Sequence, residues 1–307
     1  MFTKRTIKRA EVVSHVDTAM EALTVSLSEK AKIDLAYMSE VSGKSKETLV
    51  QDLTGVIFCN PLTEQWETAD EYLSGNVREK LVIAKQYAES NPEYDGNVQA
   101  LTRIQPKDLE ASEIEARIGA TWIAPEYIND FMKEVFETPA YQIRRNNIRA
   151  LYSEATGQWN IKGKNEDIGN PMVTTTYGTN RRNAYAILED SLNLKDSRVY
   201  DTIVEDGTEK RILNKQETML AAQKQESIRE AFKDWIFRDQ ERRQALVEKY
   251  NHLFNATRPR EYDGSHLKFP GMTPDIELKT HQKNAVSHVL YGNNTLLAHC
   301  VGAGKTF

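Results

Sequence analysis

Apolar and polar positions alternate in a way that makes the first part of the chain helical. From about Ala10 to Glu89 apolar residues recur mainly at the spacing of a helix face. Ser45 is placed to cap one of these helices, which ends at Gly55. The next apolar residues, Val56–Phe58 and then Gln65–Thr68, are typical of two short strands. The pattern therefore predicts helix, tight turn, helix and hairpin, in that order.

That order of elements is the order of a winged helix-turn-helix, whose second helix docks in a DNA groove. Here the second helix covers about Ser45–Leu53. Lys44 and Lys46 are offset by Glu47 and Asp52, and the segment offers no Arg to read guanine. Contact with DNA and a plain packing role both remain interpretations of this helix.

After a turn at Asn91–Gly96, the pattern predicts further helices. One is expected to start at Pro106 or Ser112. A stronger one begins at Pro125, where proline suits the first helical position, and ends at Thr138-Pro139. Its apolar stripe is typical of a core-facing helix.

Short strands then alternate with a helix at about Arg181–Leu192. The expected strands are Ile148–Tyr152, Gln158–Ile161, Met172–Tyr177, Val199–Glu205 and Lys210–Leu213. The first two flank a turn and place Trp159 across their hairpin. The last two flank Asp206-Gly207, a hairpin turn sequence. This middle part is therefore predicted to be α+β.

A long helix is expected over residues 214–250, with a break near Asp239. Its mixed charges favour a solvated face over a nucleic-acid stripe. Two Pro- and Gly-rich clusters, at 258–265 and 269–274, then indicate an ordered, irregular linker. We therefore expect three parts: a winged-helix-like segment at 1–90, an α+β accessory region at 91–275, and a new domain at 276–307.

The last part carries candidate chemistry. A helix capped by Thr280 and a strand at Thr295–Ala298 precede the sequence Gly302-Ala303-Gly304-Lys305-Thr306. Such a loop cradles phosphates with its backbone N–H groups, while the Lys neutralises β/γ-phosphate charge and the Thr holds Mg²⁺. His299 stands where the longer consensus has Gly, which weakens a general P-loop assignment and disfavours a different P-loop ATPase. A glycine-rich turn that binds no nucleotide is the other alternative. The fold class predicted is α+β and helix-rich, ending in the first helix and strand of a P-loop (RecA-like) α/β domain.

The composition of the chain limits which classes of protein it can belong to. The 307 residues allow two or three domains, and 39% hydrophobic with 28% charged residues is ordinary for a globular protein. A net charge of −5 argues against binding nucleic acid over the whole surface, though not against a local basic patch. Cys59 and Cys300 have no metal-ligand spacing, and no apolar run is long enough to cross a membrane. A soluble, cytoplasmic protein with no membrane partner is expected.

Residues Leu278 to Thr306 resemble the opening of the Swi/Snf-like branch of superfamily-two helicases. Gln282 falls where that family has its adenine-reading Gln, whereas His299-Cys300 replaces its common Asp-Glu. Upstream segments are similar to the region before the motor in very large bacterial mobile-element proteins, which often join an adenine DNA methylase to such a helicase. These segments are Asp34–Met38, Trp66–Gly75, Gly119–Ile123, Asn183–Tyr185, Lys233–Phe237 and Arg258–Leu267.

The resemblance implies ATP hydrolysis coupled to movement along double-stranded DNA. It implies that Lys305 binds the β/γ-phosphates of ATP, that Thr306 holds Mg²⁺, and that Gly302–Gly304 cradle phosphate oxygens. The acidic pair, arginine finger and second lobe of such a motor are expected beyond Phe307, so no catalytic residue is assigned and no ATPase activity is expected from this chain alone. Asn91-Pro92-Glu93-Tyr94 lacks the methylase pattern and is interpreted as a turn. The rival interpretation is a non-enzymatic interaction or DNA-binding module with a vestigial nucleotide loop.

Overall fold

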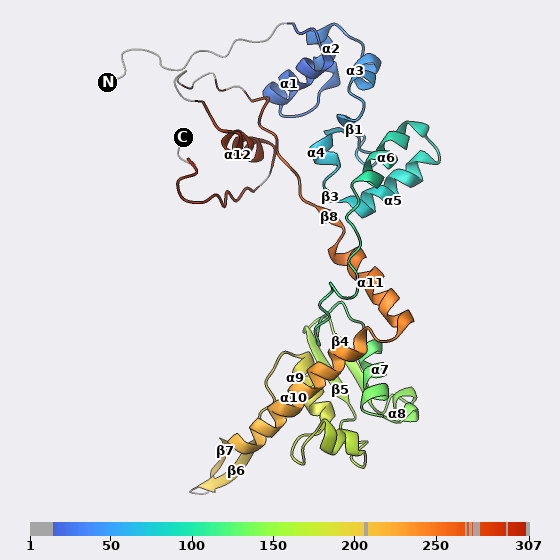
Figure 1. Cartoon of the computed structure of the whole chain (residues 1–307), viewed down its shortest axis with the longest axis vertical. Helices are drawn as coiled ribbons and strands as arrows, with labels where there is room; N and C mark the ends of the chain where they lie inside the picture. The colour runs from blue at the N-terminus through green and yellow to red at the C-terminus, as the bar shows by residue number, and fades with distance from the viewer. Residues whose placement is uncertain are drawn as a thin grey trace, which may run out of the picture. The chain divides into compact units, whose positions relative to one another are not determined.

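The computed structural model describes residues 15–205, 208–267, 269, 272, 277–292 and 294–304. As predicted, the fold is α+β and rich in helix (Figure 1). Its described strands form four separate two-stranded antiparallel sheets. The chain divides into two compact units. Unit 1 combines residues up to 107 with residues from 254 onward, and unit 2 holds residues 108–253. The expected three-part division at 90 and 275 stays a prediction.

Unit 1 begins with the predicted helices and hairpin. These elements are α1 (Ala19–Lys30), α2 (Leu35–Ser42), α3 (Lys46–Asp52), β1 (Ile57–Cys59) and β2 (Trp66–Thr68). Local chemistry sets their ends: Thr18 and Glu21 form a capping box before α1, and Gly43 ends α2 with a φ of 67°. One apolar cluster, with Met38 and Leu49 fully buried at its centre, joins the three helices to the hairpin.

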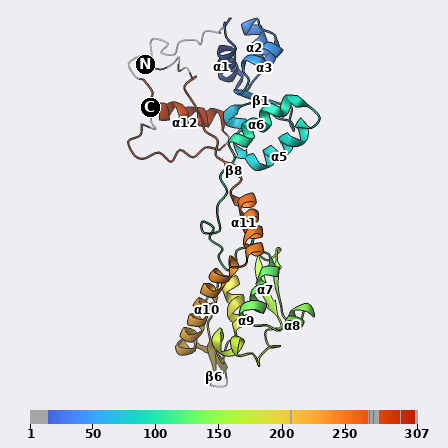
Figure 2. The ribbon, with the colours of Figure 1, turned by 45° about the vertical axis from the view of Figure 1, so that its right-hand side comes forward.

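The rest of unit 1 is mainly helical. It comprises α4 (Ala69–Tyr72), β3 (Gly75–Asn76), α5 (Val77–Ala88), η1 (Pro92–Tyr94), α6 (Asp95–Arg103), β8 (Thr257–Arg258) and α12 (Thr280–Tyr291). Helices α5 and α6 lie side by side (Figure 2). Phe58 of β1 stacks on Tyr72, with ring centroids 5.2 Å apart, and both pack with Val77 and Leu101. Through Phe58 the α5–α6 pair is joined to the hairpin.

The expected linker is ordered where it is described. Residues 259–267 have no helix or strand, yet they pack closely on α12. Tyr262 stacks on His288 with centroids 4.1 Å apart, and the backbone N–H of Gly264 donates to Asn284 Oδ1 at 3.0 Å. A Cβ on Gly264 would lie 2.0 Å from the Lys283 carbonyl oxygen, so only glycine allows this approach. Residues 259–267 follow the irregular path expected of them, while most of the second expected cluster, 269–274, lies outside the described residues.

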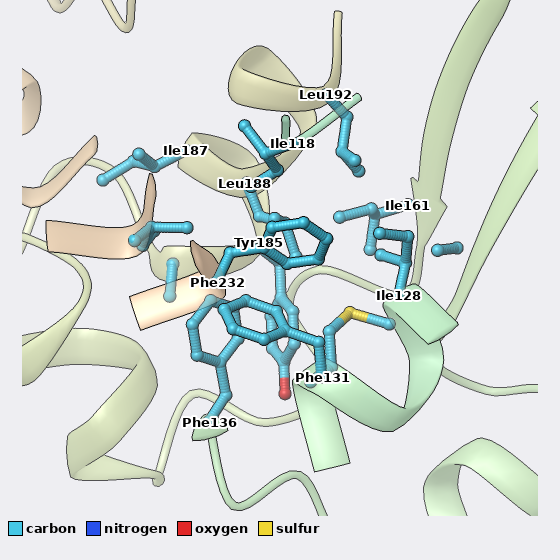
Figure 3. Packing of buried hydrophobic residues seen from close by; sticks show 14 of the residues in the cluster. Ile118, Ile128, Phe131, Phe136, Ile161, Tyr185, Ile187, Leu188, Leu192 and Phe232 are labelled. Carbon is cyan, nitrogen blue, oxygen red and sulfur yellow. The ribbon is translucent and has the colours of Figure 1, made fainter. Parts of the chain in front are cut away.

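Unit 2 surrounds a large aromatic core. Its elements are α7 (Pro125–Val135), α8 (Ala140–Arg144), β4 (Arg149–Ser153), β5 (Gln158–Lys162), η2 (Met172–Thr176), α9 (Ala184–Leu192), β6 (Tyr200–Glu205), β7 (Thr208–Leu213), α10 (Lys215–Ile236) and α11 (Gln240–Phe254). Phe131 lies among the aromatic rings of this core: it meets Phe136 and Phe232 edge-on at 5.2–5.3 Å (Figure 3). Its ring also meets Trp235 edge-on at 5.3 Å. The Pro125 helix, both hairpins and the break near Asp239 are confirmed.

Two expectations for the middle region are wrong. No helix starts at Pro106 or Ser112, because residues 104–124 follow an irregular path held by distant groups. Asn251 Oδ1 accepts from the N–H of Leu109 at 2.8 Å, and its Nδ2 donates to the Leu109 carbonyl at 2.9 Å. The expected strand at 172–177 is instead the π-helix η2, since the side chain and carbonyl of Asn170 bind Met172 and Thr174 locally.

The strand expected at Thr295–Ala298 is also absent, since residues 295–300 have no regular secondary structure. A strand needs a neighbour for its backbone hydrogen bonds. Among the described residues, no other strand pairs with this segment. The strand of the predicted P-loop setting is therefore not formed among the described residues, although the helix that precedes it is present.

Candidate nucleic-acid interface

Helix α3 occupies the position of a recognition helix. Its start is set by Ser45, whose hydroxyl accepts a hydrogen bond from the N–H of Thr48 at 3.2 Å. Leu49 is fully buried and anchors the inner face. The outer face exposes Lys46 and Gln51. Because Lys can bind guanine or phosphate and Gln can pair with adenine, this face carries suitable groups for contacting DNA.

The charge on α3 is nearly balanced. Lys44 Nζ lies 2.7 Å from Asp52 Oδ2, so Asp52 offsets the charge of Lys44, and of the two lysines Lys44 and Lys46 one is paired. Hydrogen bonds from its own backbone N–H and from Ser45 hold the pKa of Glu47 below its usual range, which keeps this exposed side chain anionic. Lys46 makes no ion pair with another described residue. One lysine therefore supplies the attraction that α3 offers to a phosphate.

The wing formed by β1 and β2 adds no positive charge. Residues 60–67 contain no Lys or Arg, and Asn60 Nδ2 donates to Glu67 Oε1 at 2.7 Å. At the tip Leu62 is 63% exposed. Since winged helices bind the DNA backbone through cations, this wing is poorly suited to phosphate contact.

The outer face of α3 forms one wall of a groove of about 700 Å³. The opposite wall comes from Tyr94 and from Ala100 and Arg103 of α6, while Trp66 of β2 also lines it. Asn97 of α6 fixes this arrangement, because its Nδ2 donates to the carbonyl of Cys59 at 2.9 Å. A ligand that fills the groove beside α3 therefore also meets α6 and two aromatic rings.

Cys59 lines the same groove but is not a reactive thiol. It is half-buried, and this burial raises the pKa of its thiol. A raised pKa leaves little thiolate near neutral pH, and the thiolate is the nucleophilic form. The groove is therefore suited to binding rather than to cysteine chemistry.

The residues predicted to bind nucleotide lie partly within the described chain. Gln282 belongs to the first turn of α12, where its Oε1 accepts from the N–H of Lys279 at 2.9 Å and its Nε2 donates to the carbonyl of Gly304 at 2.8 Å. His281 Nε2 lies 2.9 Å from the carbonyl oxygen of Ala303. The start of α12 thus holds the glycine loop through two consecutive carbonyl groups. Lys279, and not Thr280 as expected, is the residue that precedes the helix.

The described part of the loop fits a phosphate cradle in one respect. Gly302 and Gly304 have φ angles of 85° and 77°, the left-handed region in which successive N–H groups can converge on an anion. Gly302 lies in a turn that is closed where the N–H of Ala303 donates to the Cys300 carbonyl at 3.3 Å. Lys305 and Thr306 lie outside the described residues.

The other candidate sites lose support in the structure. Asn91 Oδ1 accepts from the N–H of Glu93 at 3.1 Å, so the Asn91–Tyr94 sequence forms a capped turn, as predicted. Over the described ranges, no three His, Cys, Asp or Glu side chains gather as metal ligands. Nor does any described helix have the length and apolar character required to cross a membrane.

Comparison with known families now bears on these elements. Residues 15–67 match the family described as probable helicase, winged helix domain, and this range covers α1 to the middle of β2. Residues 117–256 match a domain of unknown function, DUF8437, which covers most of unit 2. No curated protein and no solved structure matches the chain. Residues 15–67 are thus similar to a helicase-associated winged helix, a kind of module that typically binds DNA. The order of elements predicted for this segment is confirmed.

Proposed function

We propose that this chain is the DNA-binding accessory region of a Swi/Snf-like, ATP-dependent helicase or translocase acting on double-stranded DNA. The observation that carries this proposal is the winged helix at residues 15–67, which matches a helicase family and exposes α3. The resemblance of Leu278–Thr306 to the start of such a motor supports the same assignment. A fused adenine methylase and an origin in a mobile element belong to the proposal as well.

In this proposal α3 makes the DNA contact with Lys46 and Gln51. Both are exposed on the helix, and Lys46 stands beside the groove that Arg103 borders from the other side. A nucleic-acid backbone that follows the groove would meet one cation from each wall. Since the wing is without cations, α3 alone would bind weakly and the chain would need further contacts.

The nucleotide site in this proposal is the glycine loop. The backbone of Gly302, Ala303 and Gly304 would surround the phosphates of ATP, Lys305 would neutralise them, and Thr306 would hold Mg²⁺. When bound, Mg·ATP supplies the phosphoryl group whose hydrolysis drives such motors. Gln282 engages both ends of its amide with backbone groups. Reading an adenine would therefore require Gln282 to exchange its bond to Gly304 for one to the base.

The test is DNA binding by the full chain with a fluorescent duplex, measured by anisotropy. The double variant Lys46→Gln, Gln51→Ala is expected to weaken binding by roughly tenfold or more, because it removes both α3 contacts and each is worth about 1–3 kcal/mol. Lys85→Gln on the exposed side of α5 is the matched control and should bind as the wild type does. Equal binding by all three proteins would remove α3 from the interface.

A non-enzymatic interaction module is the second candidate, and the groove favours it. Its walls include Val50, Ala100, Trp66 and Tyr94, which suit an apolar partner as well as a nucleobase. Salt separates the two functions, since phosphate contacts weaken steeply with salt and apolar contacts do not. Salt-insensitive binding of a protein partner, with no affinity for DNA, would support the module.

A further inference from the structure

We infer that unit 2 carries a second contact for duplex DNA, on the outer face of the β4–β5 hairpin and the adjoining end of α8. This inference rests on the proposed DNA-binding function, and it gives unit 2 a role in that function. The basic surface in question consists of Arg144, Arg145, Arg149 and Lys162. Figure 1 shows α8 and the two strands within unit 2.

Charge is concentrated in this part of the chain. Residues 140–164 include five basic side chains and one acidic side chain, although the whole chain has a net charge of −5. The acidic one, Glu154, lies in the hairpin turn, whereas Arg149 and Lys162 pair at the opposite end of the strands. Four residues of strand separate these ends, or about 13 Å. The cations therefore dominate the end next to α8.

Two of the cations face each other directly. Arg149 of β4 pairs with Lys162 of β5 in the antiparallel register. Like charges in directly opposite positions destabilise a sheet. Arg149 Nη1 donates to the neutral Asn146 Oδ1 at 3.1 Å, and no carboxylate from the described residues pairs with Arg149 or Lys162. An anion from outside would relieve this repulsion.

The neighbouring arginines extend the same surface. Arg144 ends α8 and Arg145 follows it, both are exposed, and neither makes an ion pair with another described residue. The next cation along the chain is different, because Lys164 Nζ lies 2.7 Å from Glu189 Oε2. Glu189 Oε2 also accepts from the N–H of Ile161 at 2.6 Å. The carboxylate of Glu189 is thus already engaged, and none of the four cations makes an ion pair with a described residue.

The rest of the outer face suits DNA in shape and polarity. Beyond Arg149 and Lys162, the outward positions are Leu151 with Asn160 and Ser153 with Gln158, and all four are exposed. A two-stranded ribbon fits the major groove, where Asn and Gln amides can pair with base edges while Arg and Lys bind the flanking phosphates. Exposed Tyr141 on α8 adds an aromatic ring beside the arginines. Charge and shape together favour duplex DNA as the partner.

The experiment uses the full chain and a fluorescent DNA duplex between about 50 mM and about 200 mM salt. The variant Arg144→Gln, Arg145→Gln, Arg149→Gln, Lys162→Gln is expected to bind at least tenfold more weakly at the lowest salt. Its plot of log affinity against log salt should be less steep by roughly 0.9 for each phosphate that the variant no longer neutralises. The matched control changes four exposed cations of α10, α11 and the turn between them. These changes are Lys233→Gln, Arg238→Gln, Arg243→Gln and Lys249→Gln. The control should keep the wild-type slope.

A second variant tests the same face without removing any cation. Gln158→Glu with Asn160→Glu places two acids on the outer face and should also weaken duplex binding, with unchanged thermal unfolding. The inference is overturned if both hairpin variants bind as the wild type does, or if the control loses as much affinity as the quadruple variant. If the α3 variant binds the duplex more weakly than the wild type and the hairpin variants do not, this inference fails while the proposed function stands. When the wild-type chain binds no duplex at any salt, both fail.

Discussion

The side-chain amide of Asn193 pairs with both backbone polar groups of Trp159. Asn193 Oδ1 accepts from the N–H of Trp159 at 2.9 Å, and Nδ2 donates to its carbonyl at 2.9 Å. On the other strand, Asn129 Oδ1 accepts from the N–H of Ala150 at 2.8 Å. Helix side chains thus take the place of further strands at both edges of the β4–β5 hairpin. This explains how a two-stranded sheet, which is marginal alone, is held with one face toward solvent.

Asn193→Ala should lower the stability of unit 2 by about 2 kcal/mol, because it removes the hydrogen-bond partner of both the backbone N–H and the backbone C=O of Trp159. Asn160→Ala, at an outward position of the same hairpin, should change stability by less than about 0.5 kcal/mol. Urea unfolding followed by tryptophan fluorescence reports mainly on unit 2, which holds Trp122, Trp159 and Trp235, whereas Trp66 belongs to unit 1. Equal midpoints for both variants would mean that the Asn193 bonds contribute nothing.

Phe131→Ala should destabilise unit 2 by about 3–5 kcal/mol, since it removes a fully buried ring and leaves a cavity between three aromatic neighbours. Met219→Ala on α10 is the control, because that side chain is 65% exposed. Thermal unfolding by near-UV circular dichroism measures the difference. A shift in Phe131→Ala no larger than that of the control would contradict the packing described for this core.

Asp263 should titrate below a normal aspartate. The hydroxyl of Ser265 donates to Oδ2 at 2.7 Å and its N–H to Oδ1 at 2.9 Å, and these bonds hold the pKa of Asp263 below its usual range. The stabilisation that follows is present above the unfolded-state pKa of about 3.9 and is lost as the pH falls through the lower, folded-state pKa.

The measurement for Asp263 is its side-chain carboxyl carbon shift by NMR against pH. Ser265→Ala should raise the pKa toward the usual value, whereas Ser265→Thr, which keeps a hydroxyl, should leave it low. An unchanged pKa in Ser265→Ala would show that the hydroxyl is not the cause.

Lys305→Ala should reduce binding of Mg·ATP by roughly tenfold or more, because a charge-assisted contact to phosphate contributes about 1.5–3 kcal/mol. Lys283→Ala, which removes a cation from α12, is the control and should bind as the wild type does. Titration calorimetry with the full chain measures both, and duplex DNA binding by Lys305→Ala should remain normal. If the wild-type chain takes up no Mg·ATP, the loop does not bind nucleotide in this chain by itself.

Local patterns in the sequence were sufficient for most elements. Ser45 as a cap and Gly43 as a stop delimit the helices of the winged helix, and both signals act within a few residues. The same holds at the break between α10 and α11, where Asp239 Oδ1 accepts from the N–H of Arg242 at 2.8 Å. For the candidate site, the sequence indicated α3 and its balanced charge. The sequence did not predict the groove. Tyr94 and Arg103 line it, and the spacing of apolar residues does not reveal how the segment that carries them packs against β1.

By itself, then, the sequence determined most of the helical segments and the three short hairpins, because these depend on neighbours within one or two turns. The tertiary structure decided the rest. Leu109 is held by Asn251, a residue 142 positions away, so a segment with helical apolar spacing takes an irregular path. Within the described part of the chain no strand pairs with residues 295–298, and this β-like sequence forms no strand there. The basic surface exists because antiparallel pairing brings Lys162 opposite Arg149, beside the end of α8. Backbone hydrogen bonds and charges act between groups that are close in space, and only the folded chain defines which groups are close.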